Sequence, residues 1–433
     1  MKILLSDGSG LTSRQTATQL ARAGHRVEVL TPDGLCVCRF TRHVAKLHRV
    51  PSYGADPLGW LDAALAVYQA GRFDALFPTQ EQVAVLAHSA GRLAASGVVT
   101  AVPPFEAVRA VQDKVSAFGA LGALGIPQPQ AAYIGSAAAL RALNSLPVFV
   151  KLPIGTATTG VRRVESAAAL DAVAADLEAA GAFAGDSGVV AQQPASGPLV
   201  MVQTVFVRGE LVAAHANLRV REGPRGGASH KRSLDDPARV VGPLEKLGRA
   251  LRWHGGLSAD AILTDAGPLF IDINPRLVEP GNAWRSGVDL VGALLDACAG
   301  PPPGPPRPGA DPPAPPARQP PARQPPARQP AGRGGVATHQ LLVAVLGAGE
   351  QGRGRRAVAA EIAAALTHTG SYRGSAEELT PARRDPRAAT PVLMATAAVM
   401  IRPALWRWFA SGSVAGYALT PAGWESLLRT PPA

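Results

Sequence analysis

Residues 255–276 read GGLSADAILTDAGPLFIDINPR, and this stretch decides the fold of the chain. Its two apolar runs, 258–263 and 268–273, are typical of β-strands. The turn between them contains Asp-x-Gly, and glycine tolerates the positive φ that tight hairpin turns need. The stretch therefore predicts a β-hairpin.

Three side chains with oxygen ligands interrupt the apolar pattern of this hairpin. Asp260 lies in the first strand, whereas Asp272 and Asn274 lie two residues apart in the second and share one face. A lone carboxylate in a buried strand is costly, and two of them beside an amide indicate a divalent cation. Since no His or Cys lies nearby, the ligand set favours Mg²⁺ or Mn²⁺ over zinc. The alternative is a hairpin whose aspartates face water.

A second motif, PVFVKLPIGTATTGV at residues 147–161, has the features of a phosphate-binding segment. An apolar strand delivers Lys151, whose ammonium is a compact charge that suits a polyphosphate. In the loop that follows, glycines let backbone N–H groups approach phosphates and threonines add hydroxyl donors. The loop residues that we expect to contact a nucleotide are Gly155, Thr156, Thr158, Thr159 and Gly160. The alternative is a flexible hairpin with an exposed lysine.

Asp-Ile-Asn-Pro-Arg at residues 272–276 resembles the closing signature of the ATP-grasp superfamily, which usually reads Glu-φ-Asn-Pro-Arg. The resemblance implies that Asp272 and Asn274 hold Mg²⁺ between ATP phosphates, with Asp260 as the other metal contact. It also implies that Arg276 faces the phosphates or the substrate. The sequence departs from the signature at Asp272, where glutamate is commoner. Because aspartate is one methylene shorter and bridges two metals less well, the number of metal ions stays open.

Further matches to the ATP-grasp pattern follow in the correct order along the chain. The order strand, lysine, Gly-rich loop, strand around Lys151 is the one found in this superfamily, where a mobile loop folds over the phosphates. Asp113-Lys114 lies on a helical stretch predicted at 105–126, and the resemblance implies that Lys114 contacts ATP phosphate; by itself it reads as a solvated helix lysine. VVAQQ at 189–193 resembles the hinge of the nucleotide site, so that Gln192 and Gln193 would lie beside adenine, with Gln193 in place of the usual glutamate.

A group of basic residues surrounds another Gly-rich loop, 223–227. Its members are Arg219, Arg221, His230, Lys231 and Arg232. Such a cationic loop could meet a γ-phosphate or an anionic substrate, and it could equally be a solvated loop. We take Arg219 and Lys231, together with Arg276, as candidate catalytic residues.

The N-terminal region predicts alternating strands and helices. The predicted strands are 2–5, 26–30, 75–77 and 98–102, and the predicted helices are 13–23, 58–70 and 81–95. This alternation is typical of a parallel, doubly wound, Rossmann-like lobe, and ATP-grasp enzymes resemble it by carrying such a lobe before the grasp. The first loop, Asp7-Gly8-Ser9-Gly10, matches a dinucleotide fingerprint only in part, because Ser13 occupies the third glycine position. A structural βα turn is therefore favoured over cofactor binding at this loop.

Composition bounds the function classes. The chain has 433 residues, 47% of them hydrophobic and 17% charged, as in globular proteins. Of its net charge of +11, residues 301–433 carry +8, from 15 Arg against 7 Asp and Glu, so a basic face for nucleic acid is not predicted. Three cysteines are too few for a disulfide framework, and we expect reduced thiols in a cytoplasmic protein. We see neither a signal peptide nor a run of 18 apolar residues.

The last third of the chain changes composition. Residues 301–335 are Pro-rich, with PPARQ three times between 315 and 329, and predict an extended polyproline-II spacer; a ligand for a proline-binding domain is the minor alternative. Residues 336–433 predict several helices and contain Trp406, Trp408 and Trp424. The cluster Trp406-Arg-Trp408-Phe409 could lie on a membrane surface or over a pocket, but we expect it to pack the tail onto the body.

These observations predict an α/β protein with a two-lobed ATP-grasp module of the α+β type. The predicted parts are a Rossmann-like lobe at 1–104, a nucleotide lobe at 105–190, a metal-binding lobe at 191–300, a Pro/Arg-rich disordered linker at 301–335 and a helical domain at 336–433.

The resemblance implies a ligase that uses ATP and Mg²⁺ or Mn²⁺ to convert a small-molecule carboxylate to an acyl phosphate and joins it to an amine or thiol. One alternative is a catalytically degenerate ATP-binding or regulatory protein, which Asp272 and Gln193 favour. A weaker one is an NAD(P)-dependent oxidoreductase that uses the N-terminal Gly-rich loop. The sequence identifies neither the acid nor the nucleophile, and it leaves a homodimer open.

Overall fold

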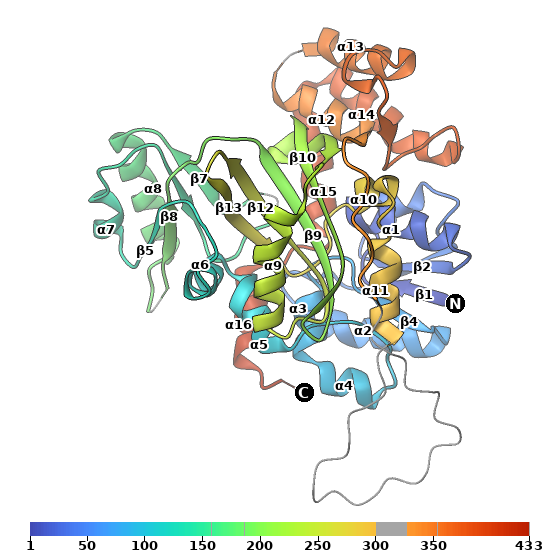
Figure 1. Cartoon of the computed structure of the whole chain (residues 1–433), viewed down its shortest axis with the longest axis horizontal. Coiled ribbons are helices and arrows are strands. Elements are labelled where there is room, and N and C mark those ends of the chain that lie inside the picture. The colour runs from blue at the N-terminus through green and yellow to red at the C-terminus, as the bar shows by residue number, and fades with distance from the viewer. Residues whose placement is uncertain (157, 186, 300–326, 353, 433) are drawn as a thin grey trace, which may run out of the picture.

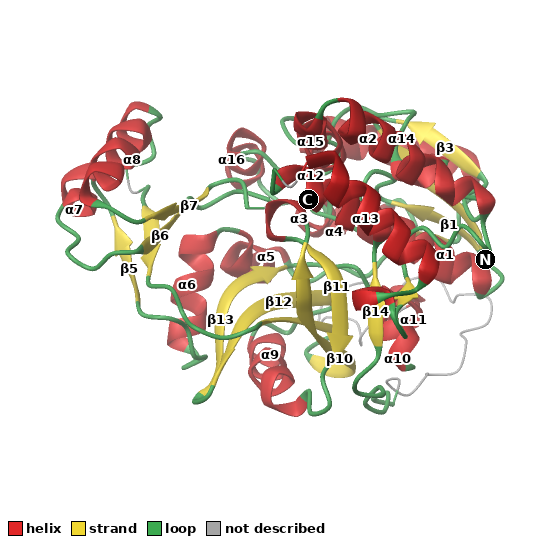
Figure 2. Ribbon diagram, turned by 90° about the horizontal axis from the view of Figure 1, so that it is seen from above, coloured by secondary structure: helices red, strands yellow, loops and turns green. Residues whose placement is uncertain are grey.

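The structure, a computed structural model, describes residues 1–156, 158–185, 187–299, 327–352 and 354–432. The chain has a mixed α/β fold built on three sheets (Figures 1 and 2). The linker prediction falls mostly outside the described residues, because 300–326 is not described.

The first sheet is parallel, as the alternation of strands and helices predicts. Its order is β3-β2-β1-β4, with β1 at Lys2–Leu5, β2 at Arg26–Thr31, β3 at Lys46–Arg49 and β4 at Ala75–Phe77. The helices α1 (Leu11–Arg22) and α2 (Pro57–Gly71) connect these strands. The predicted helix at 81–95 is two short helices, α3 (Val83–His88) and α4 (Ala90–Ala95). The predicted strand at 98–102 is wrong: these residues form no strand, although the Val99 carbonyl accepts from Leu76 N–H.

The second sheet is a small antiparallel one that stands apart at the left of Figure 1. Its order is β5-β8-β6-β7, with β5 at Ala131–Ile134, β8 at Val189–Gln192, β6 at Val148–Lys151 and β7 at Val161–Val164. Two helices, α7 (Ala137–Arg141) and α8 (Ala167–Ala179), share a core with it. The predicted helix at 105–126 is interrupted: Asp113 is extended between α5 (Phe105–Gln112) and α6 (Lys114–Ala123). Its carboxylate accepts from Ser116 N–H and caps α6.

The third sheet contains the hairpin predicted from residues 255–276. Its order is β13-β12-β9-β10-β11-β14-β15. The strands are β9 (Leu199–Val207), β10 (Glu210–Glu222), β11 (Ala228–Ser233), β12 (Gly255–Thr264), β13 (Gly267–Asn274), β14 (Ala337–His339) and β15 (Ala376–Glu377). Helix α9 (Ala238–Ala250) shares the core on one face of this sheet.

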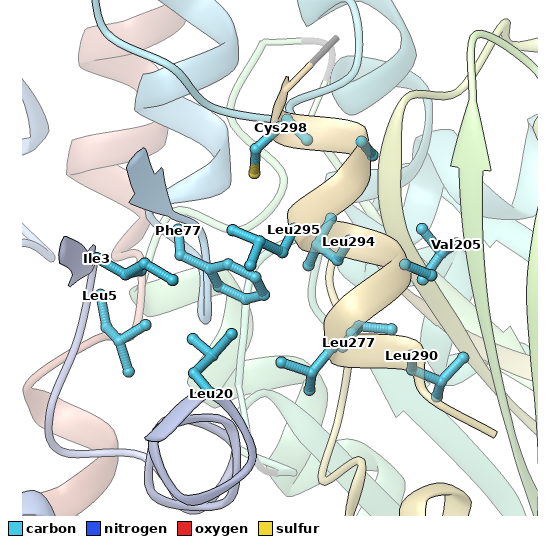
Figure 3. Packing of buried hydrophobic residues seen from close by; sticks show 14 of the residues in the cluster. Ile3, Leu5, Leu20, Phe77, Val205, Leu277, Leu290, Leu294, Leu295 and Cys298 are labelled. Atoms are coloured by element: carbon cyan, nitrogen blue, oxygen red, sulfur yellow. The ribbon is translucent and has the colours of Figure 1, made fainter. Parts of the chain in front are cut away.

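Helix α11 (Leu290–Ala299) joins the third sheet to the first. In Figure 3, Leu295 of α11 lies beside Phe77 of the N-terminal sheet, and Val205 of β9 lies on the other side of the helix. Burying one such side chain contributes roughly 1.5–3 kcal/mol, so this layer fixes the N-terminal lobe against the third sheet. The short helix α10 (Gly281–Ser286) precedes it.

The C-terminal segment is mainly helical, and two strands from it extend the third sheet. Strand β14 pairs with β11, and β15 pairs with β14. The sequence predicted only helices in this segment, so these two strands were not expected. The helices are α12 (Leu341–Glu350), α13 (Gly354–Thr367), α14 (Ala389–Ile401), α15 (Trp406–Ala415) and α16 (Pro421–Arg429). Trp424 and Leu427 of α16 are buried in the core of the N-terminal lobe, so the tail packs onto the body through α16. Of the cluster at 406–409, Trp406 is buried, but Trp408 is exposed and lines a cavity with Phe409, so the packing expected of this cluster is wrong for Trp408.

Residues 327–335, the described end of the predicted linker, are held on the body. Gln329 N–H donates to the Val212 carbonyl, and the Gln329 side chain bonds both backbone groups of Asp289. Gly335 N–H donates to the Ser233 carbonyl. The prediction of a disordered linker is therefore wrong for these residues, because their polar groups find partners on β10, on β11 and at Asp289, just before α11.

A histidine pair fastens β14 to β11. His230 and His339 face each other in register, their rings stack at 5.7 Å, and both contact the Tyr372 ring at 4.7 Å. Burial, with smaller effects from neighbouring cations, lowers the pKa of each histidine to about 4. Both rings are consequently neutral at pH 7.

This pair predicts a loss of stability on mild acidification. The folded-state pKa of each ring lies below the unfolded value of about 6.5, so the unfolded state binds more protons between pH 6.5 and 4. The stability is therefore complete above pH 6.5 and falls as the pH drops toward 4, by up to roughly 3 kcal/mol per ring. Urea unfolding at pH 7.5 and pH 5 measures it. The double variant His230→Gln/His339→Gln should show a flatter pH profile, and an unchanged profile would contradict this assignment.

Candidate active site

The hairpin β12–β13 brings the three predicted metal ligands together. Asp260 lies directly opposite Asp272, and Asn274 lies opposite Ser258, so the two carboxylates and the amide lie on one face. All three line one cavity of about 390 Å³. The register skips Ile271 between Asp272 and Phe270, which marks a β-bulge in β13.

Lys151 reaches this bulge from the second sheet. Its Nζ donates to the Ile271 carbonyl at 2.6 Å, one residue from Asp272. Burial lowers the pKa of Lys151 to about 8, and Asp272 acts in the opposite direction. Lys114 Nζ lies 3.5 Å from the Asp272 carboxylate and donates to the Gly155 carbonyl at 3.0 Å. The two lysines and the aspartate pair, which are distant in sequence, therefore form one cluster.

The aspartate pair fits a divalent cation. Burial, together with the charge of Asp272 opposite, raises the pKa of Asp260 to about 7, because two close carboxylates repel. A cation between them removes that repulsion, and two carboxylates with an amide are the oxygen ligands that Mg²⁺ accepts. In the part of the chain that the structure describes, no group of three or more His, Cys, Asp and Glu is arranged to hold a metal.

The loop after Lys151 is folded back on itself. Thr159 N–H and hydroxyl both donate to the Thr156 carbonyl, and Thr156 N–H donates to the Thr159 hydroxyl. A Cβ on Gly155 would lie 1.9 Å from the Thr159 carbonyl oxygen, so this position requires glycine. Gly160 has a φ of +82°. The glycines are thus needed for the loop itself, in addition to any approach to phosphate.

Glu81 anchors this loop to the rest of the molecule, and sequence reasoning missed it. Its Oε1 accepts from the Thr156 hydroxyl at 2.6 Å and lies 4.0 Å from Arg276 Nη2. Its Oε2 accepts from Leu419 N–H at 2.7 Å. One buried carboxylate therefore joins the N-terminal lobe, the loop, the strand end after β13 and the C-terminal segment. In the sequence it is a single acid at the start of a predicted helix, and no local pattern marks it.

Arg276 lines the cavity. Its side chain is only 8% exposed, and its buried Nε has no hydrogen-bond partner among the described residues. The guanidinium lies 6.0 Å from the Tyr417 ring centroid. A buried donor without a partner costs free energy. The arginine therefore has a hydrogen-bonding group left for an anion in the cavity.

The other two candidate catalytic residues differ from Arg276. Lys231 is 1% exposed, and its Nζ is bonded to both Glu279 and Glu378, so it does not line the cavity. Burial lowers the pKa of Lys231, but these two carboxylates outweigh it and raise the pKa above its usual value. Arg219 Nη1 donates to the Gly226 carbonyl at 2.6 Å, which holds the 224–226 turn at the cavity.

The remaining basic residues of this region are accounted for by other contacts. Arg221 forms a two-pronged ion pair with Glu361 at 2.8–2.9 Å, and His230 lies in the histidine pair. Arg232 is exposed on β11. The cationic loop predicted from the sequence therefore contributes mainly to the attachment of the C-terminal segment.

Gln192 and Gln193 lie at the end of β8, the strand next to β6 in the second sheet. Gln192 is buried, and Gln193 N–H donates to the Gln130 carbonyl at 2.8 Å. The Gln193 amide donates to the Ser145 carbonyl at 3.2 Å. From here the chain continues to β9 of the third sheet. The roles of these glutamines as a hinge and beside adenine stay predictions.

The N-terminal Gly-rich loop is filled by its own aspartate. Asp7 Oδ2 accepts from Ser9 N–H at 2.9 Å, Gly10 N–H at 2.7 Å and the Ser13 hydroxyl at 2.9 Å. Burial raises the pKa of Asp7, and the loop hydrogen bonds act against this. A dinucleotide phosphate at this helix N-terminus would have to displace the carboxylate. The geometry therefore disfavours the oxidoreductase alternative.

Comparison with known proteins supplies the fold family. No family model matches the sequence, and no curated protein matches it. Solved structures do match. A Campylobacter jejuni biotin carboxylase in complex with β-γ-ATP has a TM-score of 0.56 at 18% identity, covering 69% of this chain and 71% of that one. The chain has the ATP-grasp fold.

Two further ATP-grasp structures support this assignment. An L-amino acid ligase from Bacillus licheniformis has a TM-score of 0.52 at 17% identity, covering 69% of this chain and 74% of that one. N5-carboxyaminoimidazole synthetase from Staphylococcus aureus also has a TM-score of 0.52, at 15% identity and coverage of 69% and 77%. Identities this low establish the fold and leave the activity to be argued from the site.

The described residues contain no helix that is both long and apolar enough to traverse a bilayer. The three cysteines, Cys36, Cys38 and Cys298, are free and buried.

The position of Glu81 predicts a local effect of its removal. Glu81→Ala should accelerate amide hydrogen exchange in the 155–160 loop and around Leu419, because both lose a buried acceptor; the loss is worth roughly 1–3 kcal/mol. Exchange measured by mass spectrometry on the intact protein resolves both segments. Glu106→Ala, at an exposed acid of α5, is the matched control. Equal protection in Glu81→Ala and the control would contradict the anchoring role.

Proposed function

We propose that this protein is an ATP-dependent ligase that activates a small-molecule carboxylate and joins it to an amine or thiol. The observation that carries the proposal is the cluster of Lys151, Lys114 and the Asp260–Asp272 pair beside a cavity that Arg276 also lines. Phosphoryl transfer is catalysed mainly by positioning and charge neutralisation, and this cluster offers both.

In this proposal the nucleotide lies between the second and third sheets. Gln192 and Gln193 lie beside adenine, the glycine and threonine loop covers the phosphates, and Lys114 and Lys151 neutralise them. Asp260, Asp272 and Asn274 hold Mg²⁺, which offsets phosphate charge and orients the phosphates when bound. The similar biotin carboxylase structures contain nucleotides, one of them MgADP, which supports this choice of ligands.

In this proposal the reaction then has two steps. A carboxylate oxygen of the substrate attacks the γ-phosphorus, the bond to the β–γ bridging oxygen breaks, and ADP leaves with that electron pair. The amine then attacks the carbonyl carbon of the acyl phosphate, the C–O bond breaks, and inorganic phosphate leaves while the amine loses a proton. Arg276, with its unpartnered Nε, binds the carboxylate and the anionic oxygens that develop.

We propose different roles for the other two candidate catalytic residues. Since Lys231 is committed to two carboxylates, we propose that it positions Glu279 at the cavity wall and does not contact substrate. Arg219 shapes the cavity through the 224–226 turn and offsets the charge of Asp260. Arg276 is left as the residue that contacts the reacting groups.

Acyl phosphate formation is testable without knowledge of the natural nucleophile. Purified protein with ATP, Mg²⁺, a panel of carboxylic acids and hydroxylamine should release ADP and form hydroxamate, because hydroxylamine traps acyl phosphates. Lys151→Met should lower kcat/KM at least ~100-fold, since the loss of one charge-stabilising donor costs about 2.7–4 kcal/mol. The exposed-lysine variant Lys46→Met is the control. An active Lys151→Met would refute the proposed site.

A catalytically degenerate ATP-binding protein is the second candidate, favoured by Asp272 in place of the commoner glutamate. It predicts ATP binding without hydroxamate from any acid, and activity that appears in Asp272→Glu. The hydroxamate assay separates the two candidates, and calorimetric titration with ATP and Mg²⁺ tests the nucleotide binding that both require. Failure to bind ATP would contradict both.

A further inference from the structure

The cavity beside the aspartate pair has an apolar wall that comes from the C-terminal segment. The wall residues are Leu342, Val343 and Leu346 of α12, Met394 of α14, and Trp408 and Phe409 of α15. All the residues between 342 and 417 that line the cavity lack a formal charge at pH 7. The charges of the cavity come instead from the N-terminal lobe, the 224–227 turn and the strands around the aspartate pair.

Several of these apolar side chains are exposed where a protein usually buries them. Trp408 is 64% exposed, Met394 is 41% exposed, and Leu35, which lines the opposite side from the N-terminal lobe, is 60% exposed. Single exposed apolar residues are ordinary, but three large ones around one concavity indicate an apolar ligand.

The N-terminal lobe supplies hydrogen-bonding groups to the same cavity. Ser9 follows β1 and Gln80 follows β4, and both line the cavity. Both are buried, and Gln80 Oε1 has no hydrogen-bond partner among the described residues, whereas the Ser9 side chain interacts with the Asp7 carboxylate. Buried polar atoms in proteins normally have a partner, so Gln80 indicates a ligand with a hydrogen-bond donor of its own. Both residues lie after the carboxyl ends of parallel strands, where α/β sheets bind ligands.

We infer that the cavity selects a carboxylic acid whose body is apolar. The carboxylate lies toward Arg276 and the aspartate pair, and the aliphatic or aromatic body lies against the C-terminal wall. The orientation of the acid in this inference rests on the proposed ligase function. The apolar character of the acid rests on the uncharged wall of the cavity. The volume of about 390 Å³ falls in the range of sites that enclose a whole small molecule.

An uncharged wall also excludes the common polar acids from tight binding. The second carboxylate of a dicarboxylic acid, or the ammonium of a lysine side chain, would lose its hydration against Met394 and Phe409 without gaining a partner there. Each methylene of an apolar body, in contrast, gains free energy on burial, and two of them suffice for about a tenfold preference.

Hydroxamate formation from apolar and polar acids tests whether the cavity prefers acids with an apolar body. The full-length protein with saturating MgATP and hydroxylamine is assayed with octanoate, 3-phenylpropionate, leucine and phenylalanine, and with succinate, glutarate, aspartate and lysine. We expect kcat/KM at least ~10-fold higher for the apolar members, because two buried methylenes supply that factor. In each set of four, the first two acids lack an amino group and the last two are amino acids. The assay therefore also shows whether the protein uses amino acids or simple carboxylic acids.

Substitutions in the C-terminal wall test whether this wall causes the preference for apolar acids. Met394→Gln and Trp408→Gln should each raise KM for the preferred acid roughly 5–20-fold with little change in kcat, since they remove binding that ground state and transition state share. Leu393→Gln is the matched control, because Leu393 is 66% exposed on the same helix and does not line the cavity. All three positions are partly exposed, so the variants should fold.

The outcomes separate this inference from the proposed function. Turnover that favours succinate or aspartate and is unchanged in Met394→Gln overturns the apolar class and leaves the ligase intact. Absence of hydroxamate from every acid, with calorimetric binding of octanoate or phenylalanine that weakens in Met394→Gln and not in Leu393→Gln, overturns the ligase and supports the apolar site. Equal binding to Met394→Gln and wild type overturns the inference.

Discussion

The structure depends on the contact between Lys151 and the bulge in β13. Lys151 belongs to the small second sheet, and its Nζ donates to the Ile271 carbonyl of the third sheet, beside Asp272. A bulge re-aims backbone groups at one position of a strand, and here it presents a carbonyl to the lysine. Burial disfavours the charged form of the lysine, and this hydrogen bond and the nearby Asp272 stabilise that charged form. The contact therefore fixes the distance between the cationic and anionic halves of the site.

A second constraint comes from the segments that close around this contact. Glu81 joins the loop after Lys151 to Arg276 and to the C-terminal segment, while Lys231 joins Glu279 to Glu378. Both are buried polar clusters, which are costly when only one partner is removed. They attach the C-terminal segment at two places around the cavity. The apolar wall thus belongs to the same unit as the aspartate pair.

The sequence predicted the parts of the site that are local. Asp260, Asp272 and Asn274 could be placed on a hairpin because strand alternation and a Gly turn determine their faces. Lys151 and its glycine-rich loop could be recognised because the residue types at that spacing suit phosphates. The parallel N-terminal sheet followed from alternating strands and helices.

The contacts between distant segments could not be predicted in this way. Glu81 and Thr156 are far apart in sequence, and no local sequence pattern predicts the hydrogen bond between them. Lys231 looks cationic and accessible in sequence, yet Glu378, from the C-terminal segment, neutralises it in the fold. Strands β14 and β15 are only three and two residues long, too short for a period of two to be detected.

The most direct test is the position of a metal bound with nucleotide. A crystal structure of the protein with Mn²⁺ and a non-hydrolysable ATP analogue locates the metal by its anomalous scattering. We predict a Mn²⁺ peak between the Asp260 and Asp272 carboxylates, with the triphosphate within hydrogen-bonding reach of Lys151. A nucleotide bound elsewhere, or a metal that contacts neither aspartate, would contradict the central claim.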